Sequence, residues 1–139
     1  MRVLLWLVEG TWEACVDAVR DLGVHDITLL YVADADMVAA MSGPGLLGRS
    51  GPAPADLLTE AGHRLLDAAA QRLGRPADRE LRSGRPEHAV VAACAGADLL
   101  VLARDGDRSR PGPRSLGHAT RFVVDHAPCG VLLVWPSIG

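Results

Sequence analysis

Two short stretches of this sequence carry residue types that could bind a phosphate-bearing ligand. The first is Glu9-Gly10-Thr11, an acidic side chain followed by a flexible turn at the start of a predicted helix. Free backbone N–H groups at such a helix start attract an anion, and the acid can accept hydrogen bonds from a ribose. The second stretch is the polar segment 104–117. It contains Arg104, Gly106, Arg108, Arg110, Gly112, Arg114 and Gly117.

Glycine and arginine in segment 104–117 suit a polyphosphate for separate reasons. Glycine lets backbone donors approach the phosphate closely, and arginine binds phosphate through two parallel hydrogen bonds. The same composition also occurs in solvated surface loops, so both interpretations stay open at this point.

Other reactive groups point to no catalysis and no metal. The sequence has no lysine, which excludes Schiff-base chemistry and the lysine of a P-loop. Its three cysteines, Cys15, Cys94 and Cys129, are far apart and lack metal-ligand spacing, so we expect free thiols. The run 105–109 begins like a calcium loop, but Arg110 stands where that loop requires glycine. We therefore predict no catalytic residues, no metal site and no enzyme activity.

The elements that must position these residues alternate between strand and helix patterns, which predicts an α/β fold with a parallel sheet. Strands are predicted over residues 2–8, 27–32, 78–82, 99–103 and 131–135. Helices are predicted over residues 12–22, 55–73, 86–95 and 118–126. The glycine- and proline-rich segment 42–54 is predicted to be a mobile loop. The polar run 78–82 suits an edge strand, and the apolar run 99–103 suits a central one.

The bulk properties describe an ordinary globular chain. The length of 139 residues favours one domain over residues 1–139, and 49% hydrophobic with 22% charged residues is typical of a folded protein. A net charge of −3 argues against a nucleic-acid polymer as partner. The apolar opening 3–8 is too short for a signal peptide, and no later run is long enough to span a membrane. We therefore expect a cytoplasmic protein without a membrane partner.

Most of the chain resembles a known family. The segment ADLLVLARDGDRSRPGPRSLGHATRFVVDHAPCGVLLV, from Ala97 to Val134, is similar to the C-terminal half of universal stress proteins. There, a G-x-x-G-x9-G-S/T loop leads into a helix and then into H-A-P-C-P-V-L-V-V. LVEGT resembles the family's V-D-G-S turn, LLYV resembles its second strand, and SGRPEHAVVAACAGADLLVLA resembles its stretch before the fourth strand. The resemblance implies a three-layer domain of the adenine nucleotide alpha hydrolase-like type, with strand order 3-2-1-4-5.

The resemblance also implies an adenine-nucleotide site. In members that bind ATP, the acid after the first strand and the backbone of the second strand hold the adenosine, while the glycine loop holds the phosphates. Carried over, the cofactor is ATP or another adenine nucleotide, with Mg²⁺ as its possible companion. The implied site residues are Glu9, Gly10, Thr11, Val32, Leu102, Ala103, Arg104, Gly106, Gly117, His118, Ala119 and Thr120.

Several positions depart from the family pattern. Glu9 replaces an aspartate, Ala103 replaces the first loop glycine, and His118 stands where a hydroxyl is expected. The spacing from Gly106 to Gly117 is one residue longer than the motif. Two interpretations therefore stay open: a stress-response regulator that binds a nucleotide without rapid catalysis, and a nucleotide-free dimeric module that acts through an unknown protein partner. In both, the uncharged strand from Val131 to Trp135 is predicted to form a homodimer at the sheet edge.

Overall fold

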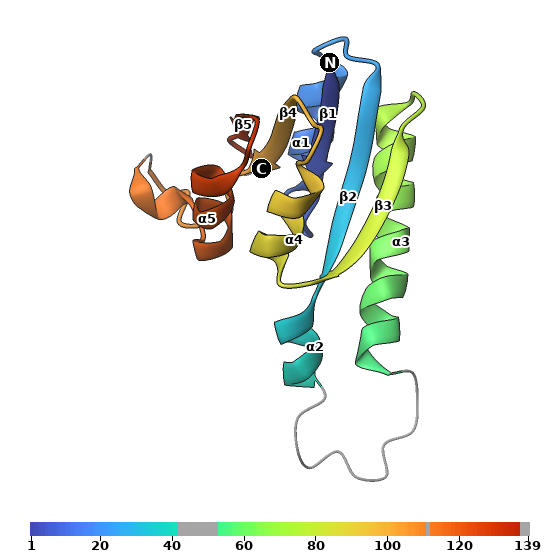
Figure 1. Cartoon of the computed structure of the whole chain (residues 1–139), viewed down its shortest axis with the longest axis vertical. Helices are drawn as coiled ribbons and strands as arrows, with labels where there is room; N and C mark the ends of the chain where they lie inside the picture. The colour runs from blue at the N-terminus through green and yellow to red at the C-terminus, as the bar shows by residue number, and fades with distance from the viewer. Residues whose placement is uncertain (42–52, 111, 137–139) are drawn as a thin grey trace.

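The computed structural model of this chain describes residues 1–41, 53–110 and 112–136 and contains a parallel sheet (Figure 1). Its described strands are β1 (Arg2–Trp6), β2 (Asp26–Asp34), β3 (Asp78–Gly84), β4 (Leu99–Ala103) and β5 (Gly130–Val134). They lie in the order β3-β2-β1-β4-β5, and every neighbouring pair is parallel. The predicted fold class and the strand order 3-2-1-4-5 are confirmed.

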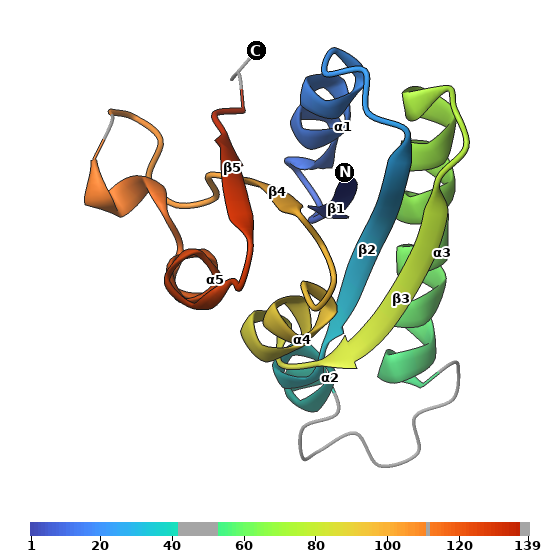
Figure 2. The same cartoon turned by 45° about the horizontal axis from the view of Figure 1, so that its top comes forward.

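Helices cover both faces of this sheet (Figure 2). The described α-helices are α1 (Trp12–Arg20), α2 (Ala35–Met41), α3 (Pro54–Leu73), α4 (Pro86–Ala93) and α5 (His118–His126), and a short 3₁₀ helix, η1, covers Pro113–Ser115. Helices α1 and α3 bury their apolar sides in one core, whereas α4 and α5 pack in a second core across the sheet. The right-handed connections of parallel strands produce this three-layer arrangement.

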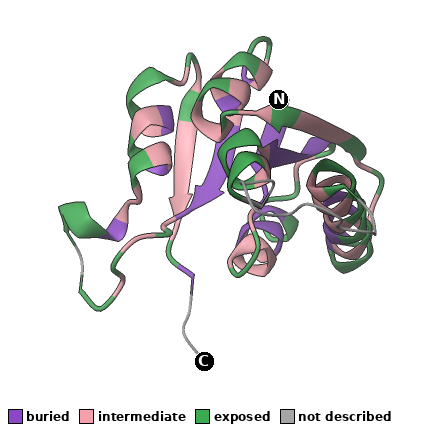
Figure 3. Cartoon of the chain, turned by 90° about the horizontal axis from the view of Figure 1, so that it is seen from below, coloured by how far each residue is buried: buried purple, intermediate pink, exposed green. Residues whose placement is uncertain are grey.

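The central strands are buried from both sides (Figure 3). In β1, Val3 and Leu5 belong to the core under α1 and α3, while Leu4 and Trp6 belong to the core under α4 and α5. Successive side chains of a strand point to opposite faces, so a strand between two helix layers needs apolar residues at every position. The prediction of β4 as a central strand is confirmed, because β4 pairs with both β1 and β5.

The structure corrects several element boundaries. Strand β1 ends at Trp6 rather than at residue 8, and β5 covers Gly130–Val134, so Trp135 lies just beyond it. Helix α2 was not predicted. It begins directly after β2, where an oxygen of Asp34 accepts hydrogen bonds from the backbone N–H groups of Asp36 and Met37 at 2.9 and 3.4 Å. Most of the predicted mobile loop, residues 42–52, lies outside the described residues, and Pro54 begins α3.

The three cysteine side chains are free thiols in the structure. Burial raises the pKa of Cys15 to about 12. Burial, together with the neighbouring Cys129, raises the pKa of Cys94 to about 12. Both thiols therefore stay protonated at neutral pH and are poor nucleophiles, because the thiolate is the reactive form.

The described residues form neither a cluster of metal ligands nor a membrane-spanning helix. Among them, no three His, Cys, Asp or Glu side chains lie together as metal ligands would. No helix formed by these residues has the length and apolar character needed to cross a bilayer.

Candidate ligand-binding site

The carboxyl ends of β1 and β4 lie side by side at the centre of the sheet. Strand β1 pairs with β2 on one edge and with β4 on the other. The chain leaves β1 for α1 on one face, and it leaves β4 for α5 on the opposite face. Ligands of open α/β sheets bind in the crevice that forms at such a reversal.

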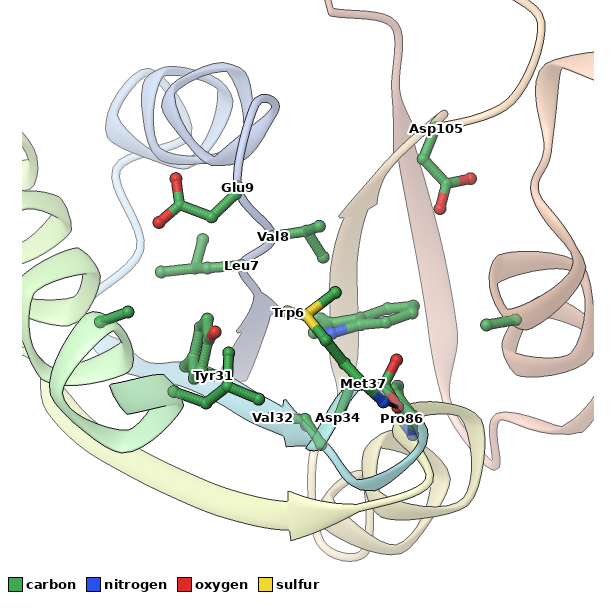
Figure 4. A pocket seen from close by; sticks show the side chains of 13 residues that line it. Trp6, Leu7, Val8, Glu9, Tyr31, Val32, Asp34, Met37, Pro86 and Asp105 are labelled. Atoms are coloured by element: carbon green, nitrogen blue, oxygen red, sulfur yellow. Dashed lines mark hydrogen bonds between the residues drawn. The ribbon is translucent and has the colours of Figure 1, made fainter. Parts of the chain in front are cut away.

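A cavity of about 340 Å³ occupies this position (Figure 4). Its size falls in the range of small-molecule sites, and most of its lining is apolar with a few polar groups, which is typical of such sites. The apolar lining residues are Trp6, Leu7, Val8, Tyr31, Val32, Met37, Leu58, Ala61, Pro86 and Ala119. The charged lining residues are Glu9, Asp34 and Asp105.

A tight turn after β1 places Glu9 at the mouth of the cavity. The backbone N–H groups of Thr11 and Trp12 both donate to the carbonyl of Val8, at 3.2 and 3.1 Å. Gly10 has a φ of +90°, which disfavours any residue with a Cβ. The turn directs the chain into α1 and leaves the Glu9 carboxylate exposed beside the ligand space.

Tyr31 forms part of the cavity wall and is held there by α3. A Cβ at Gly62 would lie only 2.5 Å from the Tyr31 ring, so the helix packs directly against that ring. Burial raises the pKa of the Tyr31 hydroxyl, and the carboxylates of Glu9 and Asp34 raise it further. The raised pKa keeps the phenol neutral at neutral pH.

Asp105 connects the end of β4 to the start of α5. One carboxylate oxygen accepts a hydrogen bond from the backbone N–H of Gly117 at 2.8 Å. The other accepts one from the hydroxyl of Thr120 at 2.9 Å, and Thr120 is buried. The carboxylate thus joins the loop after β4 to the N-cap and the first turn of α5, although it lies twelve residues before Gly117 in the sequence.

The twelve residues predicted for the site occupy five different settings. Glu9, Val32 and Ala119 line the cavity. Gly10 and Thr11 form the adjoining turn, and Leu102 and Ala103 are buried at the end of β4. Gly117, His118 and Thr120 lie at the start of α5, beside Asp105.

The remaining two predicted residues, Arg104 and Gly106, contact their own loop and do not line the cavity. The Arg104 guanidinium donates to the hydroxyl of Ser115 and lies over the Trp135 ring, 5.3 Å from its centroid. The backbone N–H of Gly106 donates to the carbonyl of Ser115 at 3.0 Å. A Cβ on Gly106 would lie 2.3 Å from the carbonyl oxygen of Arg114. The absence of a Cβ at Gly106 therefore allows the two segments of the loop, around Gly106 and around Arg114, to lie in contact.

Sequence reasoning missed several lining residues. Tyr31 is the only tyrosine and directly precedes the predicted Val32, which was the available signal. Asp105 stood out only as part of a calcium-like run, because its partners lie twelve and fifteen residues away. Ala61 gave no signal, since a small residue on an amphipathic helix is ordinary.

Comparison with known proteins gives the same family as the fold. The sequence matches the universal stress protein family over residues 9–134. No curated protein matches the chain. The structure of universal stress protein UspA from Lactobacillus plantarum is 25% identical, with a TM-score of 0.61 over 96% of this chain and 97% of that one.

Two other similar structures contain a bound nucleotide. One is a universal stress protein in complex with cAMP, 17% identical, with a TM-score of 0.65 over 98% of each chain. The other is a universal stress protein family protein from Arabidopsis thaliana with AMP bound. It is 16% identical, with a TM-score of 0.63 over 99% of this chain and 93% of that one. With most of its length matched and the sheet order of the fold in place, this chain belongs to the universal stress protein family.

Proposed function

We propose that this protein is a cytoplasmic stress-response regulator that binds adenine nucleotides or nucleosides through their adenosine portion, in the cavity beyond β1 and β4. The observation that carries the proposal is the apolar cavity at the reversal of the sheet, with an acid at its mouth. The AMP and cAMP held by two relatives of the same fold support this ligand class. The proposal gives the site a binding role and no chemical step.

The end of β2 offers backbone groups to an adenine ring. The Leu30 carbonyl points toward β1, where it accepts a hydrogen bond from the Leu7 N–H at 2.9 Å. Backbone groups two residues apart in a strand point the same way, so the N–H and C=O of Val32 point past the end of β1. A purine edge can pair with both groups while its faces contact apolar lining residues such as Leu7 and Leu58.

Glu9 supplies the polar contact for the sugar. Its carboxylate only accepts hydrogen bonds, and a ribose offers two hydroxyl donors. The exposed position of Glu9 beside the cavity suits a group that meets a ligand at the entrance. The family resemblance implies ATP with Mg²⁺ as the ligand, so its affinity is compared with the affinities of adenosine and AMP.

Calorimetric titration with adenosine, AMP and ATP, the last with and without Mg²⁺, tests the proposed function. Adenosine has about 19 non-hydrogen atoms, and at about −0.3 kcal/mol per atom we expect a Kd of tens of micromolar. Any adenine nucleotide or nucleoside released when the purified protein is denatured would support the same conclusion. Absence of binding by all three compounds at millimolar concentration would reject it and favour the nucleotide-free interaction module.

The proposal includes a homodimer formed along β5. This strand lies at the sheet edge, and the apolar side chain of Trp135 beyond it is 41% exposed. Pairing with the same strand of a second copy across a twofold axis would satisfy the open edge. The three free thiols fit the reducing cytoplasm.

Sedimentation equilibrium tests the dimer. We expect the mass of two chains for the natural protein. Trp135→Glu should weaken the dimer at least about tenfold, because the twofold axis would bring two like charges together. Leu22→Glu is the matched control, since Leu22 is also an exposed apolar residue, at 51%, and lies after α1. A single-chain mass for the natural protein, or equal effects of both substitutions, contradicts β5 as the interface.

A further inference from the structure

We infer that Asp105 makes the cavity select a nucleoside without phosphate over a nucleotide that carries a phosphate chain. This inference rests on the proposed function, because it concerns the ligand of the same cavity. It starts from the first turn of α5, whose backbone N–H groups would otherwise attract an anion. In this chain the Asp105 carboxylate lies at that turn, where it accepts hydrogen bonds from the N–H of Gly117, the N-cap residue, and from the hydroxyl of Thr120.

The fit between Asp105 and the first turn of α5 is close. Both carboxylate oxygens are engaged, one by the N–H of Gly117 at 2.8 Å and the other by the hydroxyl of Thr120 at 2.9 Å. A Cβ at Gly117 would lie 2.9 Å from the nearer oxygen, so the carboxylate fills the space that this glycine leaves. A phosphate at the same place would have to displace the Asp105 carboxylate, which would then lose these two hydrogen-bond donors.

The charges of the cavity point the same way. Among the described lining residues, the three charged side chains, Glu9, Asp34 and Asp105, are all acidic, and none of the lining residues is basic. The arginines next to Asp105 and Thr120 in the sequence have other partners. Arg104 donates to Ser115, and Arg121 donates to the carbonyl of Pro113. These carboxylates repel a phosphate chain, and no positively charged residue in the cavity lining offsets this repulsion.

A neutral nucleoside neither displaces Asp105 from its hydrogen bonds nor is repelled by the three carboxylates. Its base needs only the apolar walls and the backbone of β2, and its hydroxyl groups are donors to the same carboxylates that repel phosphate. In particular, a free 5′-hydroxyl directed toward α5 can donate to Asp105, which a phosphate cannot do. The chemical class selected is thus an uncharged purine nucleoside.

The test compares adenosine with ATP by calorimetry at fixed ionic strength, using the natural protein, Asp105→Asn and Asp105→Ala. The natural protein should bind adenosine at least about tenfold more tightly than ATP. This ratio of affinities is measured on the natural protein alone. In both variants this ratio should fall at least about tenfold, because the charge at the start of α5 is gone. Asp105→Asn retains the size and one acceptor oxygen, so it keeps the test valid if Asp105→Ala does not fold.

Asp107→Asn is the matched control. It removes the same charge from the same loop, but the Asp107 carboxylate contacts only Ser109 among the described hydrogen bonds and does not line the cavity. Its adenosine-to-ATP ratio should equal that of the natural protein. ATP binding as tight as adenosine binding in the natural protein, or an unchanged ratio in the Asp105 variants, overturns the selection while leaving the proposed function standing. Absence of binding of either compound overturns both.

Discussion

Replacing Ala61 with tryptophan is expected to lower the affinity for adenosine at least about 100-fold while leaving the fold intact. Ala61 lies on α3, is half-buried and lines the cavity. An indole at this position would occupy a large part of the roughly 340 Å³ that the ligand needs. The substitution adds bulk into open space and not into the packed core, so it should cost little stability.

The measurement is the same calorimetric titration, with circular dichroism to verify the helix and sheet content. Ala68→Trp is the matched control, because Ala68 lies two turns later on α3, is also half-buried and lines a neighbouring shallow groove but not the cavity. It should bind adenosine like the natural protein. If Ala61→Trp is folded and binds adenosine normally, the ligand does not occupy this cavity.

Replacing Gly106 with alanine is expected to destabilise the protein by about 2–3 kcal/mol even without a ligand. The new Cβ would lie 2.3 Å from the carbonyl oxygen of Arg114 and within 3.0 Å of two further backbone carbons. Backbone atoms cannot rotate away as a side chain can, so the two parts of the loop must separate. The hydrogen bonds from the N–H groups of Gly106 and Asp107 to the carbonyls of Ser115 and Arg114 would weaken with them.

Urea denaturation followed by circular dichroism measures this loss as a lower midpoint with an unchanged slope. Ser109→Ala is the control, because Ser109 is an exposed residue of the same loop and should change the free energy of unfolding by less than about 0.5 kcal/mol. If Gly106→Ala is as stable as the natural protein but has lost ligand affinity, the glycine serves the ligand and not the loop.

The alternation of strand and helix patterns in the sequence was sufficient to predict an α/β fold with a parallel sheet, and the family resemblance supplied the strand order. Apolar runs such as 99–103, flanked by helical periodicity, identify buried parallel strands because both faces of such a strand meet helices. The polar run 78–82 correctly predicted an edge strand, since β3 pairs only with β2 among the described strands. Helix α2 escaped prediction because its seven residues are too few to show a period and its cap, Asp34, belongs to the preceding strand.

The sequence by itself determined which strand ends come together. Strand order and the alternation of strand and helix bring the turn at Glu9 and the loop after Ala103 to one crevice, because parallel strands all end at the same side of a sheet. Only the tertiary structure decided which side chains contact one another around that crevice. The Asp105 carboxylate reaches Gly117 and Thr120, Gly106 lies against Arg114, and Arg104 lies over Trp135. Such contacts join residues eight or more positions apart at distances of a few ångströms, and no local propensity or spacing rule encodes them.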